Sequence, residues 1–508
     1  MSTSSISSLL NSLNPNNESI AELLGEPTTS NTSANNSSTD AAVLEAVDAI
    51  LNSATNTSGS GIDVTSTVDA ILELDAVPEE NLQNQVTALN SQTSALQTIE
   101  TDLTNLQTAV QALNDPMGAF SDVAVNSSNN DVVSATAANG TAAGEHLITV
   151  GNLASTSVAY SAAQPSASSA LPTGTLTIQV GSNPADALTV PVDTNGSDPD
   201  TLRALASYIN GQNAGVTASV ITESSGAVLS LVSQTSGQAG SLTVTDDTGA
   251  SDNGLGFTTE AGADARLTVD GVPVTSGSNT VTGVLPGVTL ALSGTSSSPV
   301  ALDVQPDLTQ VSTGINNFVS AWNQLMNDIN AQNTYSGSGS APPLLGDPSL
   351  DLLQSTLLND ITSSVSGNGA AVNLQSVGIQ LQENGTLTVQ SSSSTDSMAL
   401  NDALANDFSA VQNLFQSTSG GVAQALHTDL TNLTSSANGP LNLDMSSISG
   451  QVSDLNDQIS EFQYQLQQTQ AQLTTEYSTI NTTLEQLPEL LNSINQQLDA
   501  LNPTTKTP

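Results

Sequence analysis

The stretch that decides the fold is ISGQVSDLNDQISEFQYQLQQTQAQLTTEYSTINTTLEQLPELLNSINQQLDAL, residues 448–501. Its apolar residues recur at steps of three and four, which places them along one side of a helix. Nearly every residue between them is polar, mostly Gln, Asn, Ser, Thr, Asp or Glu. The apolar stripe is therefore narrow, and only a partner helix can cover it. The stretch predicts a coiled-coil helix.

A second seam with the same spacing lies in residues 82–113. Before it, Asp63 or Thr65 can cap a short helix, and Pro78 followed by two glutamates suits the first turn of the next helix. We expect the two seams to pack together; the alternative is a bundle that never meets another subunit. The predicted coiled-coil or oligomer contacts are Leu96, Ile99, Leu103, Leu106, Val110, Leu113, Val452, Leu455, Ile459, Phe462, Leu466, Leu473, Tyr477, Ile480, Leu484, Leu491, Ile494, Leu498 and Leu501.

The C-terminal seam is not uniform. Between Leu466 and Tyr477 its spacing gains an extra four-residue step, a stutter that locally unwinds a left-handed supercoil. Pro488 removes a backbone hydrogen bond to Leu484 and is expected to kink or split the helix. We therefore expect residues 448–486 to pair with the N-terminal seam, and the remainder to order only against other subunits.

Between the helical ends, residues 120–307 alternate apolar and polar positions and are punctuated by Gly, Pro, Asn and Asp, which is typical of β-strands. One helix is expected in this region, at residues 200–210. From Asp270 the sequence predicts a run of tight hairpins. The fold class is therefore α+β and multidomain, with helical ends packed together and β-rich domains inserted between them.

Helical patterns return at residues 308–329, 350–365 and 399–415, and Trp322 and Phe318 are predicted core anchors. A hairpin before the last of these helices places Asn384 and Gly385 in a primed turn. The predicted parts are a disordered polar arm (1–60), a helical segment (61–118), a β-rich connecting part (119–173), an inserted β/α module (174–260), a β-hairpin part (261–307), an α+β part (308–440), a coiled-coil helix with a break near Pro488 (441–501) and a flexible tail (502–508).

Residues 1–60, which we call the N-terminal arm, are dominated by Ser, Thr and Asn. Two short amphipathic segments interrupt them, at residues 6–13 and 41–51. The arm has too few apolar side chains to offset the entropy of ordering it, so it is predicted to be disordered when alone.

Charge and composition exclude several classes of partner. Asp and Glu number 48 against 3 Lys and Arg, which gives a formal net charge of −45 over 508 residues. Nucleic acid is excluded because binding it needs several basic side chains to neutralise phosphates. Cysteine is absent, which rules out disulfides and thiolate zinc sites. No apolar run is long enough for membrane insertion, and residues 1–17 lack a Sec-type signal, so export would use another route.

The residues that carry chemistry are sparse. His146 and His427 lack a nearby motif with a paired acid, and no nucleophile elbow accompanies either one. The segment DTNGSDPD, from Asp193, departs from a calcium loop because Gly196 falls at loop position four instead of six. No phosphate-binding glycine motif is present. We therefore predict no enzyme activity, no cofactor and no metal site.

Several motifs follow one another along most of the chain. Gly61-Ile62-Asp63 leads into ILELDAVPEENLQ, and GADARLTVDGVPVTSGSNTVTGVLPGVTLALSG (262–294) is the most specific block. LLGDPSLDLLQSTL, VGIQLQENGTLTVQ and ALANDFSAVQNLF come later in the sequence. Residues 174–245 resemble the small insertion module shared by flagellin and hook-associated proteins. Taken together, these motifs resemble the flagellar filament cap family, also called hook-associated protein 2.

The resemblance implies a non-enzymatic cap at the distal end of the bacterial flagellar filament. The cap would be a homo-oligomeric ring that promotes insertion and polymerisation of exported flagellin. An extracellular location at the flagellum tip and export by the flagellar type III apparatus follow. Expected partners are further copies of the chain, flagellin, hook–filament junction proteins and a flagellar export chaperone. An adhesive role for the β-rich middle is a further hypothesis.

Two features depart from the family pattern. The family motif normally lies close to the start of the chain, whereas here the N-terminal arm precedes Gly61. The scarcity of Lys and Arg also argues against charge-based contacts between subunits. The alternatives are a flagellin-like or hook–filament junction protein, which would lack the block 262–294, and a coiled-coil surface adhesin, which should carry an anchor or a Sec signal.

Overall fold

The computed structural model describes residues 63–501, with gaps at residues 194–197, 250–253, 336, 338, 394–397 and 419. The predicted disordered arm, the Gly61-Ile62 pair and the predicted tail of residues 502–508 lie outside the described residues. The chain divides into two compact units. The terminal unit comprises Met1–Thr101, Asp328–Asp351 and Asn432–Pro508, and the central unit comprises Asp102–Asn327 and Leu352–Thr431.

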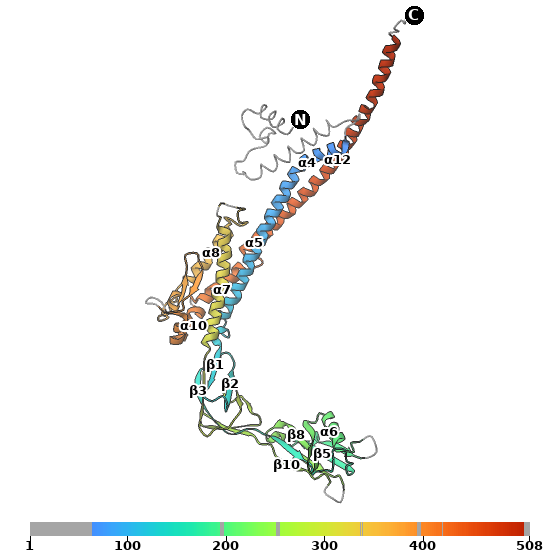
Figure 1. The fold of residues 1–508 in the computed structure, drawn as a ribbon. Helices are drawn as coiled ribbons and strands as arrows, with labels where there is room; N and C mark the ends of the chain where they lie inside the picture. The colour runs from blue at the N-terminus through green and yellow to red at the C-terminus, as the bar shows by residue number, and fades with distance from the viewer. Residues whose placement is uncertain are drawn as a thin grey trace. The chain divides into compact units, whose positions relative to one another are not determined.

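Long helices build the terminal unit (Figure 1). They are α4 (Val64–Asp75), the first part of α5 (Val77–Asn114) and α12 (Pro440–Leu501). Asp63 caps α4, because its carboxylate accepts hydrogen bonds from the hydroxyl and amide of Ser66, at 2.8 Å and 3.2 Å. These two bonds lower the pKa of Asp63. The alternative cap, Thr65, lies inside the helix.

The C-terminal helix continues through Pro488, so the predicted break near this residue is wrong. Proline has no amide hydrogen, which leaves the Leu484 carbonyl without its helical partner. Both residues are exposed, and water can therefore satisfy that carbonyl. One lost hydrogen bond on a solvated face is not enough to end a helix of 62 residues.

In the central unit, a helical part surrounds one aromatic core. Its elements are α7 (Leu308–Asn333), α8 (Pro348–Ile361), β16 (Ile379–Leu381), β17 (Leu387–Val389), α9 (Leu400–Asn406), α10 (Phe408–Gln416) and α11 (Val422–Leu433). Of these, α7 belongs to the central unit up to Asn327, α8 from Leu352 and α11 up to Thr431. Phe120, Phe318, Trp322 and Phe415 are at most 3% exposed, and their neighbouring ring centroids lie 5.6–6.4 Å apart. This confirms Trp322 and Phe318 as core anchors.

Two local predictions in this helical part are wrong. The helix expected at residues 399–415 is divided at Asp407, whose extended backbone and side chain, bonded to the Ala410 amide, start α10. The β16–β17 hairpin has a longer loop than a primed turn, because only Gly385 and not Asn384 has positive φ. A bond from the Gly385 amide to the Gln382 carbonyl (3.0 Å) closes the loop.

Two antiparallel sheets form the head, which includes the hairpin part predicted at residues 261–307. A five-stranded sheet has the order β1 (Val123–Ser127), β15 (Val300–Pro306), β3 (Gly144–Asn152), β11 (Ala265–Val269) and β12 (Val272–Ser276). A three-stranded sheet has the order β13 (Thr280–Thr282), β14 (Val288–Leu292) and β2 (Val133–Ala137). Both sheets contribute to one aliphatic core, in which Ile148, Leu290 and Leu302 are at most 1% exposed.

The inserted module contains two more antiparallel sheets and one helix. One sheet has the order β10 (Thr258–Glu260), β4 (Thr156–Tyr160), β8 (Gly226–Ser236) and β7 (Val216–Glu223). The other has the order β6 (Leu188–Val192), β5 (Gly174–Val180) and β9 (Leu242–Asp246). The helix is α6 (Leu202–Gly211). Strand β4 pairs with β8 and contributes Ala159 to the module core, so the boundary predicted at residue 174 is wrong. The α+β class of the whole chain is confirmed.

Candidate assembly interface

The two seams pack together within the terminal unit. The Gln463 side chain donates a hydrogen bond to Glu79 Oε1 (2.6 Å), and the Asn442 side chain donates one to Glu100 Oε1 (3.1 Å). From Glu79 to Glu100 the residue numbers rise along α5, while those of the bonded partners fall from Gln463 to Asn442 on α12. The two helices are therefore antiparallel. The predicted pairing of the two seams is confirmed for the part of α12 up to Gln463, whereas Ile480 and Leu484, inside the predicted range 448–486, are exposed.

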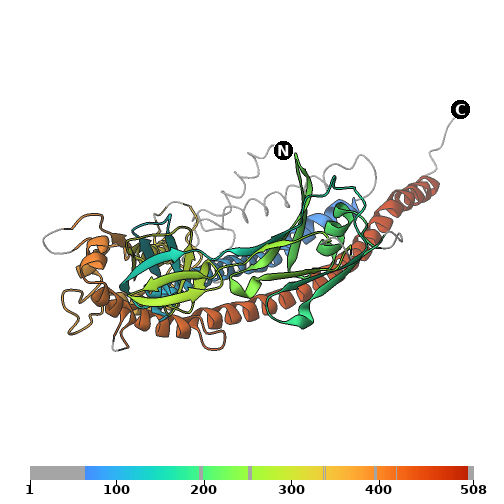
Figure 2. The ribbon, with the colours of Figure 1, turned by 90° about the horizontal axis from the view of Figure 1, so that it is seen from below.

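Helix α4 extends the cover that α5 gives to α12. It packs against α12 and buries Thr67, Val68 and Ala70, small residues that allow the two backbones to approach closely. Figures 1 and 2 both show α12 continuing beyond α4 towards the C-terminus. The length of α4 therefore limits how much of α12 is covered by described residues.

The covered part of the α12 seam is buried or half-buried. Ile448 and Ile459 are 8% and 9% exposed. The other predicted contacts up to Tyr477, beside the start of α4, are half-buried: Val452, Leu455, Phe462, Leu466, Leu473 and Tyr477. These side chains face helices of the same chain, so they serve first to fold the subunit. Their predicted role between copies stays a prediction.

A shallow groove of about 400 Å³ lies between α5 and α12 in this covered part. Its lining residues are Gln85, Ala88, Leu89, Gln451, Asp454, Leu455 and Gln458. The lining combines amide groups with methyl and methylene groups and a single carboxylate. Asp454 is the only ionisable side chain in the lining, which contains no histidine, serine or cysteine to form a nucleophile–base pair with it.

Beyond Tyr477 the same stripe becomes exposed. We call these residues the apolar row: Ile480, Leu484, Leu487, Leu491, Ile494 and Leu498, which are 37–57% exposed. Leu490 stands beside them and is 60% exposed. Leu501 is the last residue of α12, and its side chain lies outside the described residues. Single exposed leucines are ordinary, but a continuous row of six at heptad spacing is typical of an interface.

The N-terminal seam is shared between the two units, which the sequence did not indicate. Leu96 and Ile99 belong to the terminal unit, whereas the predicted contacts from Leu103 to Leu113 belong to the central unit. All six seam residues are at most 1% exposed. In the central unit, the Gln416 side chain donates to the Leu113 carbonyl (2.8 Å). The expectation that the whole of residues 82–113 pairs with α12 is therefore wrong for its second half.

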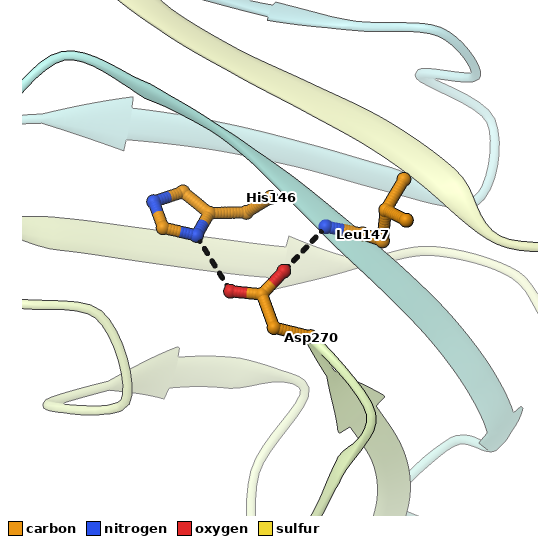
Figure 3. A network of polar contacts seen from close by, with 3 residues as sticks. All are labelled: His146, Leu147 and Asp270. Carbon is orange, nitrogen blue, oxygen red and sulfur yellow. Dashed lines mark hydrogen bonds and ion pairs between the residues drawn. The ribbon is translucent and has the colours of Figure 1, made fainter.

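The head contains a histidine–carboxylate pair that the sequence analysis missed (Figure 3). His146 Nδ1 lies 2.8 Å from Asp270 Oδ2, and the Leu147 amide donates to Asp270 Oδ1 at 2.8 Å. These two hydrogen bonds lower the pKa of Asp270, with His146 as the larger cause. Asp270 and Gly271 both have positive φ and form the two-residue β11–β12 turn, which confirms a tight hairpin there. The pair ties this turn to β3.

A buried acid pair lies in the helical part of the central unit. Asp360, on α8, is 6% exposed, and its Oδ2 atom has no hydrogen-bond partner among the described residues. Burial raises the pKa of Asp360 to about 6, with smaller contributions from the charge of Asp429 on α11 and from a hydrogen bond between the two carboxyl groups. At neutral pH the pair therefore places unfavourable charge between two helices.

The described residues offer neither a metal site nor a membrane-spanning helix. They contain no group of three His, Cys, Asp or Glu side chains placed to hold a metal ion. Residues 194–197, within the segment compared with a calcium loop, lie outside the described ranges. In the described part of the chain, every helix is too short or too polar to cross a membrane.

Two sequence models of one family match the chain. The Flagellar hook-associated protein 2 N-terminus matches residues 60–157, and the Flagellar hook-associated protein 2 C-terminus matches residues 262–489. The Flagellin hook IN motif matches residues 175–235, inside the inserted module. The C-terminal match includes the block 262–294, which we expected to separate a cap protein from a flagellin or junction protein.

Relatives and a solved structure agree with these matches. The B-type flagellar hook-associated protein 2 of Pseudomonas aeruginosa is 29% identical over 429 residues, which cover 77% of this chain and 88% of that protein. The flagellar hook-associated protein 2 of Escherichia coli K12 is 27% identical over 334 residues, which cover 61% of this chain and 70% of that protein. The crystal structure of the Escherichia coli flagellar cap protein FliD, domains D1-D2-D3, matches with a TM-score of 0.54 at 27% identity, over 70% of this chain and 99% of that one. The chain therefore belongs to the flagellar hook-associated protein 2 family of flagellar cap proteins.

Proposed function

We propose that this chain caps the distal end of a flagellar filament as a homo-oligomeric ring, and that the ring promotes insertion and polymerisation of flagellin. The observation that carries the ring is the apolar row on α12. Covering such a row on each subunit requires another helix, and neighbouring copies in a ring supply one each. The cap itself follows from membership of the family.

The route and the remaining partners are part of the same proposal. We infer export by the flagellar type III apparatus, with a flagellar export chaperone bound before export and hook–filament junction proteins beneath the cap at the start of assembly. A chaperone has an evident target in the apolar row, since a row of leucines favours association. The adhesive role stays a prediction.

Charges on the apolar row should abolish the ring. We expect Leu484→Glu together with Leu491→Glu to convert the oligomer to monomer, because each carboxylate would be desolvated at the interface. Light scattering of the purified protein measures the mass. In cells whose own copy is replaced, electron microscopy should show uncapped filament tips, and unpolymerised flagellin should accumulate in the medium.

The matched control places the same charges on the opposite face of α12. Gln486→Glu and Ser493→Glu are also seven residues apart, and both positions are exposed. These changes should leave the oligomer mass and the filament tips as in the unaltered protein. A charged-row variant that still forms the full oligomer would show that the ring uses another surface, and uncapped tips with an intact oligomer would separate capping from ring formation.

Salt should strengthen the oligomer. Each subunit carries a formal net charge of −45, so copies brought together repel one another. The Debye length falls from about 10 Å at 0.1 M to about 3 Å at 1 M ionic strength, which screens that repulsion. We expect the oligomer mass measured by light scattering to rise along a sodium chloride series. Dissociation at high salt would mean instead that ion pairs hold the ring together.

A further inference from the structure

Strand β16 has an open edge beside a groove in the central unit. We propose that this edge binds an extended, uncharged peptide segment of another protein, which adds to the β16–β17 hairpin as a third strand. This kind of recognition combines main-chain hydrogen bonds with pockets for alternate side chains of the peptide. The inference concerns a binding surface within the central unit, and it does not depend on the proposed ring.

The register of the hairpin shows which backbone groups of β16 point away from β17. The Gln382 amide donates to the Thr386 carbonyl at 2.8 Å, just beyond the end of the two strands. In an antiparallel ladder, every second residue bonds to the partner strand, and the residues between direct their groups outward. Gln380 therefore bonds to β17, whereas Ile379 and Leu381 direct their amides and carbonyls to the outer edge.

Three of these four outward groups have no hydrogen-bond partner among the described residues. The Ile379 amide donates to the Leu374 carbonyl (2.9 Å), but the Ile379 carbonyl and both groups of Leu381 lack such a bond. Ile379 is 1% exposed, and a buried carbonyl usually has a partner. Leu381 is 41% exposed, so the edge can be reached. An added strand would supply two amide donors and one carbonyl acceptor.

Two other strand edges in the central unit are closed by asparagine side chains. Asn323 accepts a hydrogen bond from the Leu387 amide (2.6 Å) and donates one to the Leu387 carbonyl (2.8 Å), which closes the outer edge of β17. Asn210 forms the same two bonds with Ala218 on the edge strand β7, each at 2.8 Å. Such an amide takes the place of a neighbouring strand. The described residues supply no equivalent cover at Leu381.

A groove of about 440 Å³ lies beside the open edge and can take side chains of the added strand. Its lining includes the apolar side chains of Ile361, Leu374 and Leu381, and the amide groups of Gln375 and Gln380. An apolar side chain of the peptide can pack against the first three residues. The two glutamine amides can bind hydroxyl or amide groups on the peptide.

Charge determines which kind of segment fits the groove. None of the lining side chains is ionisable, so a charged side chain entering the groove would lose water without gaining a counter-charge. A second copy of the chain would bring a formal net charge of −45, and at low ionic strength this repulsion is long-ranged. A neutral peptide is therefore favoured. The sequence GTLTVQ, residues 385–390, has this composition and already pairs with the other side of β16.

Fluorescence anisotropy tests the proposal on the full-length protein at low salt, with an end-blocked, fluorescein-labelled GTLTVQ peptide as the probe. Leu381→Pro should weaken binding about tenfold, because proline removes the outward amide donor. The ladder with β17 is kept, since the Leu381 amide takes no part in it. Leu381→Val keeps the amide and an apolar side chain, and should bind as the unaltered protein does. Trp322 fluorescence reports an intact hairpin, because the indole bonds to the Gly385 carbonyl (2.8 Å).

Two N-methylated forms of the peptide, blocked on one or the other set of alternate amides, separate strand addition from simple apolar contact. Only the form whose methyl groups face β16 should lose binding. Equal binding of both forms and the unmethylated peptide, or equal affinity of Leu381→Pro and the unaltered protein, would overturn the proposal. Absence of peptide binding, with a lower oligomer mass for Leu381→Pro, would assign the edge to a second copy and would also overturn it.

Discussion

Replacing Trp322 with alanine is expected to lower the free energy of unfolding of the central unit by about 4 kcal/mol, the usual cost of removing a buried tryptophan. The indole is fully buried, its ring centroid lies 6.3 Å from that of Phe318, and its Nε1 atom donates a 2.8 Å hydrogen bond to the Gly385 carbonyl. Alanine would leave a cavity and an unpaired carbonyl on the β16–β17 hairpin. Both effects act in the same direction.

Chemical denaturation followed by circular dichroism measures this loss, since Trp322 is the only tryptophan and its fluorescence disappears with it. Trp322→Phe keeps an aromatic ring and removes the hydrogen bond, so it should lower the free energy of unfolding by about half as much as Trp322→Ala. Leu352→Ala serves as the control, because Leu352 is 56% exposed. A Trp322→Ala variant as stable as the Leu352 control would contradict the assignment of Trp322 as a core anchor.

Replacing Asp360 with asparagine is expected to stabilise the protein at pH 7 and to have little effect at pH 3. The pKa of Asp360 is raised from 3.8 to about 6 in the folded chain. The folded state therefore holds its proton more tightly than the unfolded state does. The cost of ionising Asp360 is absent below pH 3.8 and complete above pH 6, and it amounts to about 3 kcal/mol at 1.36 kcal/mol per pKa unit.

Asparagine is never ionised, and its amide can donate to the Asp429 carboxylate as the protonated acid does. The stability difference between variant and unaltered protein should therefore grow from pH 4 to pH 6 and then stay constant. Thermal unfolding across that pH range measures it. Asp429→Asn should give a smaller gain in stability at pH 7, because burial is the largest cause of the raised pKa of Asp360 and would remain.

The control for Asp360 lies on the same helix. Asp351 is an exposed residue in the first turn of α8, where a negative charge favours the helix dipole. Asp351→Asn removes the same charge and should slightly destabilise the protein at every pH above 5. A gain for Asp360→Asn that is the same at pH 3 and pH 7 would show that ionisation of this carboxyl group is not the cause.

Features set by local spacing could be predicted from the sequence. The heptad pattern located α12 and its pairing with the first half of α5, and the alternating pattern located the β-rich region that includes β5, β11 and β14. Asp270-Gly271 predicted a tight turn because both residues tolerate positive φ. Each of these features depends on residues that are close in the chain.

Features that depend on tertiary contacts could not be predicted. His146 and Asp270 are 124 residues apart, and only the pairing of β3 with β11 brings them together. Asp360 meets Asp429 because α8 and α11 pack in one unit, which no spacing rule indicates. Pro488 was expected to break the helix because the sequence does not show that the Leu484 carbonyl, which loses its helical hydrogen bond, is exposed to water. The division of the N-terminal seam between two units likewise depends on which helices surround each turn.

The unequal lengths of the antiparallel helices have one further consequence. α12 projects beyond the start of α4, and this overhang carries the apolar row. Moving the start of α4 by one heptad would lengthen or shorten the overhang without changing any residue of the apolar row. In the proposed ring, the contact between subunits would thus depend on a difference of helix lengths as well as on the leucines themselves.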